Sequence, residues 1–280
     1  METDKMSTAS SVGVTRRPLM QALIVERWIL FACTILVGLC TFLWITAVCT
    51  SKWVHIEGRD DGVFVPGILF TARNTTMYFL SSDSGVWEIC RHEFVPNATK
   101  ATFRLNATVH AYDCTAVGTV PGQCYTICTN YLAQPLEDLK LRDPAYHTEI
   151  PSLVRTMTSF GIIGLFVMAM GCGFSGYTFR NPRYMFKRLA AGIHFISTSC
   201  TFVVVQVMTN TVDVLEKNVP AIYPKKAYHY FHISFYLAVF VVLVNVFAAG
   251  SFLLYSRKRK GDKAATDELA MADEPTIIGR

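Results

Sequence analysis

Long runs of apolar residues alternate with polar segments along this 280-residue chain. An α-helix needs roughly 20 apolar residues to cross the hydrocarbon core of a membrane, which is about 30 Å thick. Each run approaches or exceeds that length, so the pattern predicts four membrane-spanning helices. Their expected bounds are Trp28–Val48, Leu153–Tyr177, Leu189–Thr209 and Ile233–Tyr255.

The short segment between the second and third runs, residues 178–188, predicts the orientation of the chain. It has four basic residues and no acidic one: Arg180, Arg183, Lys187 and Arg188. Basic loops stay on the cytoplasmic side of a membrane. We therefore expect this segment and both tails, residues 1–27 and 256–280, to be cytoplasmic. Residues 49–152 and 210–232 are then extracellular loops.

Polar composition predicts disorder for Met1–Gln21, which is rich in Ser and Thr and has no aromatic residue. Four basic residues follow the last apolar run and form a stop-transfer signal, which ends translocation of the chain across the membrane. They can also contact anionic membrane lipid. These residues are Arg257, Lys258, Arg259 and Lys260.

The first extracellular loop contains several short segments rich in Val, Ile, Phe, Tyr, Trp and Thr, separated by Gly, Asp, Asn and Ser. Such segments are typical of β-strands. They predict a small antiparallel sheet, which cannot bury a large core by itself and needs covalent support. The expected strands are Lys52–Ile56, Val63–Phe70, Thr76–Leu80, Gly85–His92, Thr102–Leu105 and Thr108–Tyr112.

Four cysteines in the same loop, Cys90, Cys114, Cys124 and Cys128, provide candidates for that support. Four cysteines allow three pairings. Pairing Cys90 with Cys114 joins the two best strand candidates and leaves Cys124 with Cys128 in a turn. The spacing does not decide between these pairings, and a zinc site is the alternative interpretation of the four cysteines. Cys49 either joins these bridges or stays free.

Three acceptor sequons lie in this loop, at Asn74, Asn97 and Asn106. Sequons beside clustered cysteines predict an oxidised, glycosylated extracellular module. The overall composition agrees with a membrane protein, because 51% of the residues are hydrophobic and the mean hydropathy is +0.32. The net charge of +5 does not indicate nucleic-acid binding, since the basic residues cluster beside the spans.

The third predicted span is the most polar of the four and also holds several Ser and Thr residues. His194 and Gln206 are in the third, and Asn245, in the fourth, is expected to hydrogen-bond to Gln206, His194 or a hydroxyl of the third. Intramembrane histidine has either a functional role or, more often, a hydrogen bond to a neighbouring helix. The spans lack the acidic residues and lysines that proton-coupled transporters use. In the second span, two small-xxx-small pairs favour close helix packing, within the chain or with a partner: Ala169 with Gly173, and Gly171 with Ser175.

Other chemistry has little support in the sequence. His229 and His232 have a spacing compatible with a metal on a helix, but no nearby carboxylate or thiol completes a site. The chain has no nucleophile elbow, phosphate-binding loop or metalloprotease helix. We therefore expect no enzyme activity, no cofactor and no metal.

The order Trp53, Gly85-Val86-Trp87, Cys90, Cys114 in the first outer loop of a four-span chain resembles the W…GLW…C…C signature of the claudin-like superfamily. Val86 stands where the signature has Leu, a change that keeps the position apolar. The resemblance covers roughly Trp28–Tyr255. It implies a left-handed four-helix bundle topped by a small extracellular antiparallel β-sheet.

Within that superfamily, the chain is most similar to the gamma subunits of voltage-gated calcium channels and the related AMPA-receptor regulatory proteins. Their first loops are also long and glycosylated, whereas in claudins the two signature cysteines lie close together. Arg280 departs from the PDZ-binding C-terminus of claudins and of the AMPA-receptor regulators. The resemblance implies an auxiliary subunit in the plasma membrane that docks on a channel's pore-forming subunit and changes gating or trafficking. The alternatives are a claudin-like junction protein and a regulatory subunit of an AMPA-type receptor.

Overall fold

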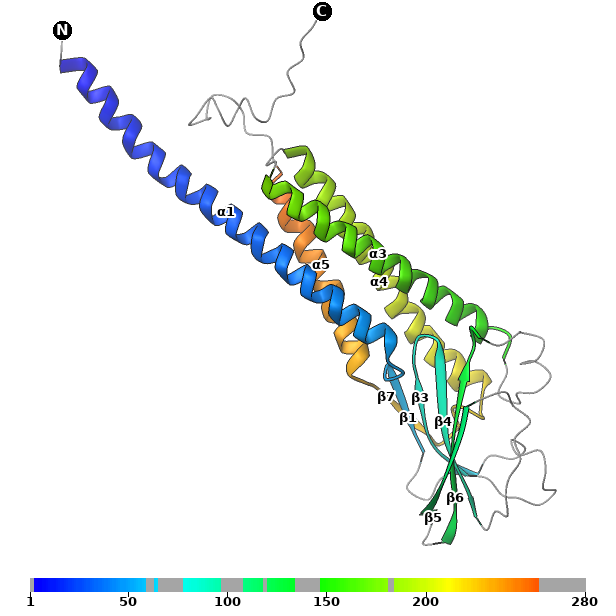
Figure 1. Cartoon of the computed structure of the whole chain (residues 1–280). Coiled ribbons are helices and arrows are strands. Elements are labelled where there is room, and N and C mark those ends of the chain that lie inside the picture. Colours follow the sequence, from blue (N-terminus) through cyan, green and yellow to red (C-terminus); the bar gives the residue numbers. More distant parts are fainter. Residues whose placement is uncertain are drawn as a thin grey trace, which may run out of the picture. The chain divides into compact units, whose positions relative to one another are not determined.

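The computed structural model describes residues 3–58, 63–64, 78–96, 108–117, 120–133, 147–180 and 184–256 (Figure 1). The chain forms two compact units, and each long helix contributes to both. The first unit comprises residues 1–42, 164–199 and 241–280, and the second comprises residues 43–163 and 200–240.

Within the described residues, four helices are long and apolar enough to cross a membrane, which confirms the four-span prediction. They are α1 (Thr3–Cys49), α3 (Ile150–Arg180), α4 (Tyr184–Asn218) and α5 (Ile233–Leu254). Pro151 lies in the first turn of α3, where a missing N–H removes no helical hydrogen bond. At about 1.5 Å per residue, α4 is longer than the hydrocarbon core is thick, so it extends beyond the membrane at one or both ends.

Two helices extend well beyond their predicted bounds, α1 at its start and α4 at its end. The N-terminal segment was expected to be disordered, yet α1 begins at Thr3 and runs without interruption into the apolar span. Extending an existing helix adds one hydrogen bond for each residue ordered, so a polar segment can continue a helix that it could not nucleate. The third helix likewise continues to Asn218, into the segment expected to be a loop.

The sheet is antiparallel and has the strand order β5-β6-β4-β3-β1-β7, with β2 paired to β3. β5 and β6 form a long hairpin, with β4 beside β6 (Figure 1). The bounds are β1 Val54–Glu57, β2 Val63–Phe64, β3 Tyr78–Ser84, β4 Glu88–Pro96, β5 Thr108–Val117, β6 Val120–Asn130 and β7 Tyr228–Phe231. The expected strand Thr102–Leu105 lies outside the described residues.

Two of these strands were not predicted. In β6, Gly122 is a register partner of Pro96, and a Cβ atom on it would lie 2.6 Å from the ring of Phe94. The glycine is therefore needed where the aromatic ring covers the backbone, although it resembles a strand breaker in the sequence. β7 comes from the second predicted loop and pairs with β1, Val54 opposite Phe231. The sheet is thus not built from the first loop alone.

Side-chain contacts hold each unit together. In the first unit, Lys187 Nζ of α4 donates a 2.7 Å hydrogen bond to Glu26 Oε1 of α1, and both side chains are mostly buried. The second unit has an aromatic core in which Trp44, Trp53, Phe79 and Phe94 are almost inaccessible to solvent. Trp44 Nε1 donates a 3.0 Å hydrogen bond to the Gly161 carbonyl, which joins α1 to α3.

Candidate functional site

Trp53, the first residue of the sequence motif, lies in the short connection between α1 and β1 and is fully buried. Its Nε1 donates a 2.7 Å hydrogen bond to the carbonyl oxygen of Ala47, in the last turn of α1. The indole ring makes edge-on contacts with Trp44 and Phe235. A buried indole N–H needs such a partner. Trp53 therefore fixes the direction in which the chain leaves α1 for the sheet.

The Gly85-Val86-Trp87 motif forms the turn between β3 and β4. Gly85 N donates a 2.8 Å hydrogen bond to the Glu88 carbonyl, and a Cβ atom on Gly85 would lie 2.7 Å from the Cα atom of Ser51. Only glycine fits this close approach of two backbones. The strand was expected to begin at Gly85, but it begins at Glu88. The motif is therefore a turn against the end of α1, with Trp87 half-buried.

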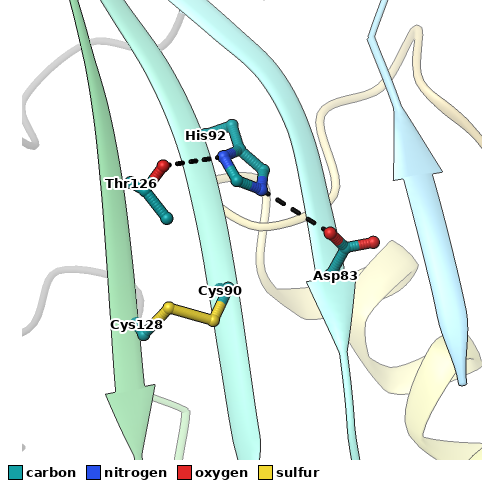
Figure 2. Close-up of a disulfide and its surroundings, with 5 residues drawn as sticks. All are labelled: Asp83, Cys90, His92, Thr126 and Cys128. Carbon is teal, nitrogen blue, oxygen red and sulfur yellow. Dashed lines mark hydrogen bonds and ion pairs between the residues drawn. A yellow bond between two sulfur atoms is a disulfide. The ribbon is translucent and has the colours of Figure 1, made fainter. Parts of the chain in front are cut away.

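The sequence left three disulfide pairings open, and the structure decides between them. Cys90 of β4 is bonded to Cys128 of β6, its register partner (Figure 2). The arrangement with Cys90–Cys114 and Cys124–Cys128, which would join the two best strand candidates, is therefore wrong. Cys124 is also disulfide-bonded, whereas the side chain of Cys114 lies outside the described residues. Because β6 was not predicted, the position of Cys128 opposite Cys90 could not be predicted either.

The zinc alternative fails for the same two cysteines. Glu88, Cys90 and Cys128 bring potential ligand atoms together, but both sulfur atoms are in the disulfide, so neither is a thiolate. Cys49 is free and exposed. The sequon residues Asn74, Asn97 and Asn106 lie outside the described residues, so glycosylation remains a prediction.

One side-chain cluster on the sheet was not predicted from the sequence. His55 of β1 and His92 of β4 both contact Asp83 of β3, and His92 also contacts Thr126 of β6 (Figure 2 shows the part around His92). Alternation along each strand could have placed these side chains on solvent-facing positions. It could not have shown that they meet, because that depends on the strand register.

His194 of α4 is fully buried, and its Nε2 lies 2.8 Å from the Ser175 Oγ of α3. Its ring also faces Phe252 of α5 at 5.6 Å between centroids. This geometry confirms the expected hydrogen bond to a neighbouring helix. A neutral imidazole held by a hydroxyl has a packing role, so His194 needs no ion to explain it.

Asn245 of α5 is also fully buried. Its Nδ2 donates a 2.9 Å hydrogen bond to the Val241 carbonyl and contacts the Met168 sulfur of α3. Asn245 interacts with His194 as well, one of the three expected partners in α4. Gln206 is exposed and is not that partner. The buried polar side chains therefore link α3, α4 and α5 within the first unit.

The comparison with protein families decides the identity of the fold. The model of the PMP-22/EMP/MP20/Claudin tight junction family matches residues 38–254. The chain belongs to this family. That span includes Trp53, the turn at Gly85, the seven strands that the structure describes and three complete helices, so the match covers both units. No curated protein is similar enough to the chain to count as a match.

In this member of the PMP-22/EMP/MP20/Claudin family, the two small-residue pairs of α3 point in different directions. Gly171 and Ser175 are buried against α4, where they contact His194. Ala169 and Gly173 are exposed, and a Cβ atom on Gly173 would have no heavy atom within 4 Å. The first pair thus serves intrachain packing, and the second is open on the helix exterior.

His229 and His232 do not form the metal site considered from their spacing. His229 lies in strand β7 rather than in a helix, and its Nδ1 is 2.9 Å from the hydroxyl of Tyr223. Burial, with the nearby charge of Glu216, raises the pKa of Tyr223, so this hydroxyl stays protonated and can donate to the ring. His229 therefore has a structural partner.

Proposed function

We propose that this family member is a non-enzymatic auxiliary subunit of a voltage-gated calcium channel. It resides in the plasma membrane with both termini in the cytoplasm. There it binds the pore-forming subunit sideways and changes gating or surface delivery. A subunit of this kind acts through its differential affinity for the gating states of its partner.

The exposed small-residue face of α3 carries this proposal. Ala169 and Gly173 let the backbone of another helix approach closely in lipid, where association depends on packing rather than on a hydrophobic driving force. Exposed apolar side chains, Phe166 and Met170, flank the pair and can interdigitate with a partner helix. A face with open small residues and large neighbours suits lateral docking within the membrane.

The polar side chains in the spans support a binding role over a transport role. Across the described helices, the deeply buried polar residues His194 and Asn245 have partners within the chain. Glu26, near the start of the apolar part of α1, and Lys187, in the first turn of α4, are paired with each other. Transporters and pores place ionisable or discontinuous elements at mid-membrane and leave them accessible to the transported species.

Topology and loop composition support the location. Exposed Arg180 and Arg188 lie at the ends of α3 and α4 nearest their short connection, which favours a cytoplasmic connection. The cysteines and sequons then lie outside, where disulfides persist and glycans are attached. Glycans on the long loop also hinder close apposition of two cell surfaces, which favours a channel partner over a junctional one.

The proposal is tested by co-expression with a panel of pore-forming subunits that includes AMPA-type receptors. Gly173→Leu fills the open face, and Gly192→Leu is the matched control, because it adds the same side chain at another exposed helix position with nothing within 4 Å. We expect Gly173→Leu alone to reduce co-purification and the shift in voltage dependence. The proposal fails if the wild-type chain neither co-purifies with any calcium channel nor alters its voltage dependence or surface level.

A junctional role is the second candidate, because the matching family is described by its tight junction members. In that role the sheet contacts a counterpart on the next cell. Enrichment of the chain at cell contacts, with altered paracellular conductance after its removal, supports this role. Retention at free membrane surfaces together with a channel supports the first.

A further inference from the structure

Four strands contribute to one row of polar side chains on the half-exposed face of the sheet. His55 Nδ1 of β1 lies 2.6 Å from Asp83 Oδ1 of β3, and His92 Nε2 of β4 lies 3.5 Å from Asp83 Oδ2. His92 Nδ1 is 3.0 Å from Thr126 Oγ1 of β6. A single carboxylate thus lies between two imidazole rings, and the side chains of all three residues are between 20% and 28% exposed.

The short contact defines where the protons lie. An ionised carboxylate only accepts hydrogen bonds, so Nδ1 of His55 donates to Asp83. The contact to His92 places an N–H on Nε2, which leaves Nδ1 free to accept a hydrogen bond from the Thr126 hydroxyl. Both imidazole rings therefore have hydrogen-bond partners while they are neutral. A further proton on His55 occupies Nε2, and one on His92 turns the Thr126 hydroxyl into the acceptor.

Asp83 keeps its charge over the range in which imidazoles titrate. Burial by itself raises the pKa of Asp83, but hydrogen bonds from His92 and His55 and the attraction to their charged forms outweigh it and lower the pKa. An imidazole usually changes charge between about pH 5 and 8. The carboxylate of Asp83 is therefore ionised throughout that range.

We propose that His55, Asp83 and His92 form a proton-sensing cluster, which mild acidification converts from one formal negative charge to one positive charge while it tightens the sheet. Charge-assisted hydrogen bonds are roughly twice as strong as neutral ones. Protonation of His55 strengthens the tie between β1 and β3, and protonation of His92 strengthens the tie between β3 and β4.

The groups around the cluster allow this change of charge. The ring of Tyr230 of β7 lies tilted beside His55, with 5.1 Å between ring centroids, close enough for its π system to attract an imidazolium. Glu57 of β1, which accepts a 2.7 Å hydrogen bond from Tyr228 of β7, adds a negative charge one pleat away.

The remaining neighbours lie along β4, β5, β6 and β7. Beyond His92 on the same face of β4 are Cys90 and Glu88, and the Cys90–Cys128 disulfide extends to β6 (Figure 2). The ring of His232, just after β7, contacts Tyr230. On β5, the register partner of Thr126 is His110, whose side chain lies outside the described residues. No lysine or arginine side chain of the described strands faces the cluster, because Arg91 is buried on the other face.

The pH dependence of this stabilisation has two limits. The imidazolium pairs contribute at the acidic end of the imidazole range and their contribution is lost as pH rises. Asp83, whose pKa is lowered, contributes above its ordinary pKa of about 4, and this contribution is lost as pH falls through the lowered value. The benefit of Asp83 is therefore largest at about pH 5 to 6 and smaller at both ends.

The experiment measures the thermal unfolding midpoint of the full chain in lipid nanodiscs between pH 3.5 and 8, for the wild type and for Asp83→Asn. The wild type is expected to exceed the variant by roughly 2–4 °C more at pH 5.5 than at pH 8, the size of about one charge-assisted pair. His92→Gln and His55→Gln should each remove part of this difference. His147→Gln, outside the sheet, is the matched control and should leave it unchanged.

A constant difference between the wild type and Asp83→Asn across this pH range overturns the proposal. If Asp83→Asn does not fold, the double variant His55→Gln/His92→Gln replaces it, since glutamine keeps one donor for Asp83 in each ring's place. A wild-type pH profile that survives in the double variant also overturns the proposal. Replacing His110 by Gln tests whether β5 contributes; a full loss of the difference with that variant alone assigns the effect to His110 and contradicts the cluster.

Discussion

The ring of His194 packs directly against the backbone of Gly171, so that a Cβ atom on this glycine would lie 2.9 Å from Cε1 of the ring. Because the ring is also held by Ser175 and Phe252, it cannot move away at little cost. We expect Gly171→Ala to destabilise the protein by about 1–3 kcal/mol, as overpacking does.

The same substitution at Gly173 is a matched control, because no heavy atom lies within 4 Å of a Cβ atom there. Alanine has the higher helix propensity, so Gly173→Ala should be neutral or slightly stabilising. Thermal unfolding of both variants in the same detergent measures the difference. Equal midpoints for the two variants would contradict the packing of His194 against α3.

Trp53→Phe should destabilise the protein by about 1–3 kcal/mol, because the buried Ala47 carbonyl loses its hydrogen bond from the indole and a gap is left beside Trp44. Trp28→Phe is the control, since Trp28 is 67% exposed. The unfolding midpoint of Trp53→Phe should therefore be lower than that of Trp28→Phe. A loss of stability with Trp28→Phe alone would argue against the assigned role of Trp53.

Removing the disulfide with the double variant Cys90→Ala/Cys128→Ala should cost roughly 4 kcal/mol on the chain-entropy account of a bridge that spans 38 residues. Cys49→Ala removes a free, exposed thiol and should have little effect. Proteolysis without reductant, followed by mass spectrometry, should recover the Cys90 and Cys128 peptides linked to each other. Recovery of Cys90 linked to Cys114 would contradict the structure.

Lys187→Met should destabilise the first unit by about 3–5 kcal/mol, because it removes the ammonium group that is paired with the mostly buried Glu26 carboxylate. The exchanged pair Glu26→Lys/Lys187→Glu should recover most of that loss. Arg27→Gln, next in sequence but exposed, serves as the control. If the exchanged pair is no more stable than Lys187→Met, the charge pair does not hold α1 to α4.

The helices could be predicted from the sequence because their signal is local. The expected fourth span, Ile233–Tyr255, differs from α5 by one residue, since a long apolar run that ends at basic residues has few alternatives. Helix extension was harder to predict. The polar residues that continue α1 and α4 have no distinct hydrophobic pattern. They are helical because they extend a helix that already exists.

The sheet was predicted as a sheet, but its register was not. β6 contains Pro121 and Gly122, which are typical of a turn, and only the partners β4 and β5 make that segment a strand. The pairing of Cys90 depends on this same register, as does the meeting of His55, Asp83 and His92. Contacts between distant strands follow from tertiary structure and leave no short-range pattern in the sequence.

The pairing of β7 with β1 has a consequence for biosynthesis. The partners Val54 and Phe231 are separated by almost the whole first loop and two helices, so the edge of β1 stays bare until the segment before α5 has been synthesised. An uncovered strand edge is a site of aberrant pairing during folding. A ribosome stalled before residue 228 therefore presents quality-control factors with an unfinished sheet, and completion of the second loop is the event that closes it.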